Sequence, residues 1–100
     1  MTNSYTVAVL GSTGYVGLEL VKILLNHPNI RINFLGCENS PNLNIHDFDN
    51  NIKSNCLPNL SLNDDFNPSN SDVVFLALPH GVSHTYVKKF FNNIIIIDLS

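Results

Sequence analysis

Seven residues near the N-terminus have types and spacing that suit chemistry: Gly11-Ser12-Thr13-Gly14-Tyr15-Val16-Gly17, a G-x-x-G-x-x-G motif. In such a turn the first glycine permits a tight bend, the middle one lets a diphosphate approach, and the third lets a helix pack on a strand. The N–H groups that open the helix, with its dipole, can then bind an anion without a lysine. The alternative is that the glycines serve only the turn and its packing. The motif predicts a backbone site for a dinucleotide.

Two further groups follow later strand-like runs and complete the set of candidate cofactor-binding residues: Cys37, Glu38 and Ser40, then Leu78, Pro79 and His80. Glu38 stands about twenty residues beyond the turn, where an acid holds a ribose 2′-hydroxyl and favours NAD. If Glu38 instead turns to solvent, the N–H groups after the second strand and the Ser40 hydroxyl can receive the 2′-phosphate of NADP. His80 is placed to contact the nicotinamide half, or is an exposed loop histidine.

Metal chemistry is not indicated. His80 and His84 are four residues apart, but no glutamate accompanies them as in H-E-x-x-H and no third ligand is in sight. A calcium-like start at Asp47 fails because Ile52 stands where glycine is required. Cys37 lies near the adenine end of the predicted site, far from hydride chemistry. We therefore expect neither a metal ligand set nor a catalytic residue on this chain.

The elements that must position these residues alternate in type. Apolar, β-branched runs at 5–10, 30–36, 72–78 and 94–97 predict strands, and helical spacing predicts helices from Tyr15 to before Pro28 and over 81–91. Residues 37–71 are rich in Asn, Ser, Pro and Asp, and predict only a short strand near 57–62 and a helical turn. Strands that alternate with helices predict an α/β fold, a Rossmann-like doubly wound parallel sheet. We expect residues 1–100 to be an incomplete, N-terminal dinucleotide-binding domain without a catalytic domain.

Composition excludes several classes of partner. The 100 residues carry a net charge of −3, and their five basic side chains form no stripe, which argues against nucleic acid and anionic membranes. The longest apolar run, 73–78, is far shorter than the roughly twenty residues of a membrane span. The N-terminus lacks the features of a secretory signal. A cytoplasmic location is the expectation.

Three segments, at 9–21, 72–81 and 97–100, resemble the N-terminal part of the N-acetyl-gamma-glutamyl-phosphate reductase family, in the semialdehyde dehydrogenase superfamily. The glycine motif alone also fits aspartate-semialdehyde dehydrogenases and extended short-chain dehydrogenases. The Leu-Pro-His-Gly segment that begins at Leu78 and the Asp-Leu-Ser segment that begins at Asp98 favour the reductase.

This resemblance implies an enzyme of arginine biosynthesis that reduces N-acetyl-glutamyl 5-phosphate to the semialdehyde with NADPH, through a cysteine thioester. It also implies a small-molecule acyl-phosphate substrate, a homo-oligomer at full length, and a nucleophilic Cys and a His in a substrate domain. Neither the segment with this nucleophilic Cys nor the one with this His is present here, so this chain alone is expected to be inactive. Family members commonly have Ser and Arg after the second strand, where this chain has Cys37, Glu38 and Asn39. NADP is the implied cofactor, with NAD possible, and a non-catalytic NAD(P)-binding sensor domain or an aspartate-semialdehyde dehydrogenase fragment is the alternative.

Overall fold

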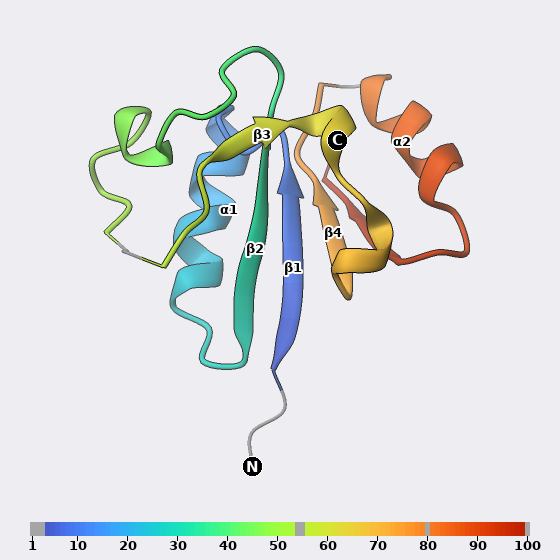
Figure 1. Ribbon diagram of the computed structural model, residues 1–100, viewed down its shortest axis with the longest axis horizontal. Coiled ribbons are helices and arrows are strands. Elements are labelled where there is room, and N and C mark those ends of the chain that lie inside the picture. The colour runs from blue at the N-terminus through green and yellow to red at the C-terminus, as the bar shows by residue number, and fades with distance from the viewer. Residues whose placement is uncertain (1–3, 54–55, 80, 100) are drawn as a thin grey trace.

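The computed structural model describes residues 4–53, 56–79 and 81–99 (Figure 1). Its regular elements are β1 (Tyr5–Leu10), α1 (Tyr15–Leu25), β2 (Ile30–Cys37), β3 (Leu60–Leu62), β4 (Val73–Leu76), α2 (Val82–Phe90) and β5 (Ile95–Asp98). Three short 3₁₀ turns occupy the long connections: η1 (Ile45–Asp47), η2 (Asn63–Asp65) and η3 (Pro68–Asn70). Within these described residues, no helix is long and apolar enough to cross a membrane.

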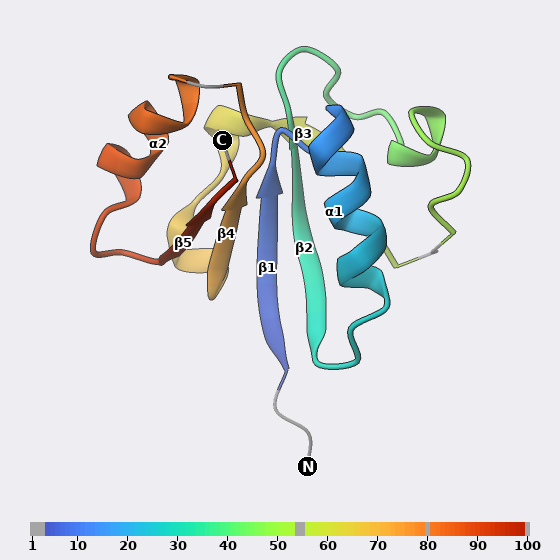
Figure 2. The ribbon, with the colours of Figure 1, turned by 180° about the vertical axis from the view of Figure 1, so that it is seen from behind.

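The five strands form one parallel sheet in the order β3-β2-β1-β4-β5. The chain leaves β1 through α1, adds β2 and β3 on one side, and then crosses back to add β4 and β5 on the other. Because parallel strands all end at the same edge, the segments that follow β1, β2, β3 and β4 meet there (Figures 1 and 2). The predicted doubly wound α/β fold is confirmed.

Two hydrophobic cores cover the two faces of this sheet. Val7 and Val9 of β1 point into the core beneath α1, whereas Ala8 and Leu10 point into the core beneath α2. This alternation is the period of two that a strand requires, and residues Val7–Leu10 are all buried because both faces are covered. The sheet is therefore a rigid support for the loops at its carboxyl edge.

Several element boundaries differ from the prediction by one or two residues. The strand expected over 72–78 pairs only as Val73–Leu76. Ala77 still donates its N–H to the carbonyl of Leu10 (3.0 Å), and Pro79, which has no N–H, follows two residues later. In α1, Val21 and Leu24 are buried, whereas Ile23 is 67% exposed. The short strand expected near 57–62 is present as β3.

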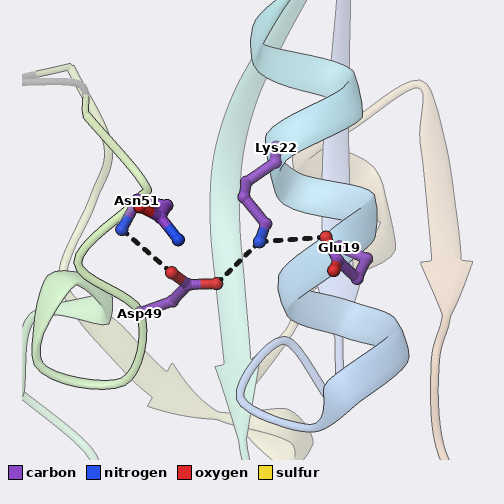
Figure 3. Close-up of polar contacts among 4 residues, drawn as sticks. All are labelled: Glu19, Lys22, Asp49 and Asn51. Atoms are coloured by element: carbon purple, nitrogen blue, oxygen red, sulfur yellow. Dashed lines mark hydrogen bonds and ion pairs between the residues drawn. The ribbon is translucent and has the colours of Figure 1, made fainter.

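An ion-pair cluster joins the connection after β2 to α1. The ammonium group of Lys22 lies 2.9 Å from a carboxylate oxygen of Glu19 and 2.9 Å from one of Asp49 (Figure 3). Asp49 also accepts the backbone N–H of Asn51 at 2.9 Å. The hydrogen bond between Lys22 and Asp49 is the largest cause of both pKa shifts in this cluster. It raises the pKa of Lys22 and lowers the pKa of Asp49. The cluster holds the segment around η1 beside α1, where Ile45 and Ile52 extend the core.

Candidate functional site

The three glycines of the turn between β1 and α1 have different surroundings. Gly11 has a φ of 74°, in the left-handed region, and a Cβ there would lie 2.9 Å from the carbonyl carbon of Ala77. At Gly17 a Cβ would lie 2.7 Å from the Cα of Ser12 and would also overlap the carbonyl oxygen of Gly11. At Gly14 a Cβ would meet only that oxygen, at 3.7 Å. The outer glycines are needed for packing, whereas the space beside Gly14 is open.

The turn keeps several backbone donors available. Gly11 donates its N–H to the side-chain oxygen of Asn63 (3.0 Å), and Ser12 donates both its N–H and its hydroxyl to the carbonyl of Gly36 (2.8 Å each). Within the described residues, the N–H groups of Thr13, Tyr15 and Val16 have no acceptor. The first turn of α1 contains no acidic residue. These donors and the helix dipole suit an anion at this point.

A cavity of about 270 Å³ opens at the same edge of the sheet, between the ends of β2 and β3 and the start of α2. Its walls are mixed apolar and acidic, and are formed by Cys37, Glu38, Leu62, Asn63, Asp64, Leu78, Pro79, Val82 and Tyr86. Asn63 links the cavity to the glycine turn, because its buried side chain lines the cavity and accepts the N–H of Gly11. The glycine turn and the cavity are therefore adjacent and are connected through Asn63.

A tyrosine and two carboxylates determine the electrostatics of the cavity. The hydroxyl of Tyr86 donates to a carboxylate oxygen of Asp64 at 2.6 Å. Burial raises the pKa of Tyr86 to about 12, with further contributions from the hydrogen bond to Asp64 and from the negative charges of Asp64 and Glu38. Tyr86 is therefore a neutral donor at physiological pH, and it faces two acidic groups.

The structure brings together some of the predicted site residues and separates others. Cys37, Glu38, Leu78 and Pro79 all line the cavity. The thiol of Cys37 is buried and donates to the carbonyl of Ser61 (3.3 Å), and Cys37 therefore contributes to the wall.

The other predicted residues differ in their placement. Ser12 is fully buried and acts within the turn, whereas Tyr15 and Val16 at the start of α1 are exposed. Ser40 donates its hydroxyl to the side-chain oxygen of Asn39 (3.2 Å) and is not part of the cavity wall. His80 lies outside the described residues.

Sequence reasoning missed three residues of the site. Asn63 and Asp64 lie in the stretch 37–71, for which only a short strand and a helical turn are predicted, and Tyr86 lies in the helix predicted over 81–91. One signal could have found the first two. Asn63-Asp64-Asp65 follows the short strand predicted near 57–62, and polar residues directly after a parallel strand lie at the ligand-binding edge.

Comparison with known proteins matches residues 6–100 to the family described as semialdehyde dehydrogenase, NAD binding domain. The chain is 43% identical to N-acetyl-gamma-glutamyl-phosphate reductase from Ehrlichia chaffeensis, in an alignment that covers 100% of this chain and 29% of that protein. It is 38% identical to the enzyme of the same name from Halothermothrix orenii, over 94% of this chain and 28% of the relative. The chain thus spans less than a third of the length of these relatives.

Solved structures agree on the fold. Aspartate semialdehyde dehydrogenase with NADP from Candida albicans superposes with a TM-score of 0.77 at 25% identity, over 96% of this chain and 29% of that one. Aspartate semialdehyde dehydrogenase II from Vibrio cholerae gives a TM-score of 0.78 over 98% of this chain and 32% of that one, and at 16% identity it supports the fold alone. The resemblance noted in the sequence is confirmed. This chain belongs to the semialdehyde dehydrogenase NAD-binding domain family.

Proposed function

We propose that this chain is the N-terminal, cofactor-binding domain of an oxidoreductase that converts N-acetyl-glutamyl 5-phosphate to the corresponding semialdehyde, a step of arginine biosynthesis in the cytoplasm. The observation that carries the proposal is the glycine turn with its available N–H groups. The chain that contains this turn is 43% identical, over all of its own 100 residues, to an N-acetyl-gamma-glutamyl-phosphate reductase. The acyl-phosphate substrate, the homo-oligomer and the substrate domain belong to the full-length protein in this proposal.

The residues present fit a nicotinamide dinucleotide. The N–H groups of Thr13, Tyr15 and Val16 would hold the diphosphate, and the open space beside Gly14 would let it approach. The cavity would take the adenosine half, with Leu78, Pro79 and Val82 as apolar walls. When bound, the cofactor supplies the hydride for the reduction. The family resemblance implies NADP, and the Candida albicans neighbour was solved with NADP.

This domain contributes binding and orientation. Cys37 is buried and bonded to Ser61, so its thiol is not placed to attack a substrate. We therefore expect the isolated chain to bind the cofactor and to leave an acyl phosphate unchanged. Turnover by the purified chain that is lost in Cys37→Ser would contradict this assignment.

The proposed activity is tested with the full-length protein. We expect phosphate-dependent oxidation of N-acetyl-glutamate 5-semialdehyde, with reduced nicotinamide cofactor as the product that is measured. Aspartate semialdehyde is the control, because it has the same reactive group on a chain that is one carbon shorter and has no N-acetyl substituent. A preference for aspartate semialdehyde would favour the aspartate-semialdehyde dehydrogenase alternative. Cofactor binding without turnover of either aldehyde would favour the sensor.

A further inference from the structure

The cavity beside the glycine turn is acidic in a way that the sequence did not reveal. Glu38 follows β2 and Asp64 lies in η2, yet both line the same cavity of about 270 Å³. Tyr86 holds Asp64 in place with a 2.6 Å hydrogen bond. Two carboxylates from separate segments thus line the cavity in which the adenosine half of a dinucleotide would lie.

The side chains of the described residues that line the cavity offer no cation to a 2′-phosphate. Among the cavity's described lining residues there is no lysine or arginine. Lys22 is engaged by Glu19 and Asp49 on the opposite side of the sheet from α2, and Lys89 lies 5.9 Å from the ring centre of Phe90. Among the described lining residues, a phosphate entering the cavity would meet two carboxylates and no cationic side chain.

The neutral donors of the cavity are mostly committed. The hydroxyl of Tyr86 donates to Asp64, and the N–H of Val82 at the start of α2 donates to the carbonyl of Pro79 (3.1 Å). The amide nitrogen of Asn63 is neutral and cannot offset two carboxylates. Carboxylates, in contrast, are good acceptors for the hydroxyl groups of an unmodified ribose.

We propose that Glu38 and Asp64 together select a dinucleotide with a free ribose 2′-hydroxyl, so that this protein prefers NADH to NADPH. The inference rests on the proposed function, because it places the adenosine half of the cofactor in this cavity. It departs from the NADP preference that the family resemblance implies. The residue that sequence reasoning considered, Glu38, has a partner in Asp64 that only the fold reveals.

The test is calorimetric titration of the full-length protein with NADH and with NADPH. We expect NADH to bind at least about fivefold more tightly, since Glu38 and Asp64 are exposed and like charges about 4 Å apart in water cost roughly 1 kcal/mol. Adenosine 5′-monophosphate and adenosine 2′,5′-bisphosphate are further probes, because they differ only in the 2′-phosphate. The same order of affinity is expected for this pair.

Three variants assign the effect to its residues. Asp64→Asn and Glu38→Gln should each reduce the ratio of NADPH to NADH dissociation constants severalfold, and the double variant should abolish the preference. Asp65→Asn is the matched control, because it removes the same charge from the adjacent exposed residue, which does not line the cavity. Its ratio should equal that of the wild type.

The possible outcomes separate this inference from the proposed function. Tighter binding of NADPH by the wild type, or a ratio unchanged in both Asp64→Asn and Glu38→Gln, overturns the inference and leaves the reductase assignment intact. An equal change in Asp65→Asn would also overturn it, because the effect would then be one of general charge. No binding of either dinucleotide overturns both.

Discussion

The glycine turn and the acidic cavity lie at one edge of the sheet, yet they are built in different ways. The turn comes from one continuous stretch, 11–17, and offers backbone N–H groups. The cavity is assembled from the ends of β2 and β3 and the start of α2, and it offers side chains. Backbone donors depend on the fold alone, whereas carboxylates can change with one substitution. The turn should therefore determine whether a dinucleotide binds, and the cavity which one.

The largest expected effect concerns the turn. In Gly17→Val the new side chain would overlap the carbonyl of Gly11 and the Cα of Ser12, both of them backbone. Because neither can move without shifting β1 or α1, we expect a loss of about 3 kcal/mol or more in the free energy of unfolding, measured by urea denaturation. A stability equal to that of the wild type would show that the helix need not pack so closely.

Asn63 joins the two regions, and its removal should affect both. In Asn63→Ala the N–H of Gly11 loses its acceptor in a partly buried place, so we expect a loss of about 1–3 kcal/mol in the free energy of unfolding. Asn39→Ala, at an exposed position near the same edge, is the control and should be close to neutral. A neutral Asn63→Ala variant would indicate that the turn and the cavity are independent.

Within the cavity, Tyr86 gives a pH-dependent signal. Its pKa is about 12 in the folded chain, against 10.0 as the ordinary value, so the folded state retains this proton over that interval while the unfolded state loses it. The protonated Tyr86 hydroxyl makes its full contribution to the free energy of unfolding below pH 10. As pH rises from 10 toward 12, the free energy of unfolding falls by on the order of 2 kcal/mol.

Tyr86→Phe isolates this contribution, because it removes the titrating hydroxyl and retains the ring. The difference in free energy of unfolding between wild type and Tyr86→Phe should shrink between pH 10 and 12. A constant difference over this range would contradict the raised pKa of Tyr86, to which burial contributes most and the hydrogen bond to Asp64 next.

The smallest effect is expected away from both regions, at the cluster around Lys22. Lys22→Met should weaken the attachment of the η1 segment to α1 only slightly, since these side chains are solvent-accessible and screened by salt. The difference from the wild type in thermal unfolding should diminish as salt is added. A large difference that is independent of salt would show that the ion pairs stabilise more than a surface connection.

Most of the fold could be predicted from the sequence because its signals are local. The run at 5–10, the glycine motif and the helical spacing after Tyr15 each act within a few residues, and all appear as β1, the turn and α1. The order of the strands could not be predicted, because it depends on the path of residues 38–72, where isolated apolar residues give no period. β3 pairs over only Leu60–Leu62, too short for a clear pattern.

The candidate site likewise has a part that local sequence signals predict and a part that depends on tertiary contacts. The turn could be predicted because its function resides in the backbone of contiguous residues. The presence of Glu38 and Asp64 in one cavity could not, because 26 positions separate them and their placement depends on where β3 joins the sheet. The hydrogen bond from Tyr86 depends in turn on the placement of α2. These are tertiary contacts that no local pattern encodes.

The central claim is that the glycine turn binds the diphosphate of a nicotinamide dinucleotide, and Gly14→Val tests it most directly. Gly14 has a φ of −77°, and its Cβ would have a single contact, at 3.7 Å, so the variant should fold, at a cost of about 1 kcal/mol for a weaker helix cap. Titrated with NADH and NADPH, it should bind both at least about tenfold more weakly than the wild type, because the branched side chain occupies the space of the diphosphate. Unchanged affinity for both dinucleotides in the folded variant would contradict the account.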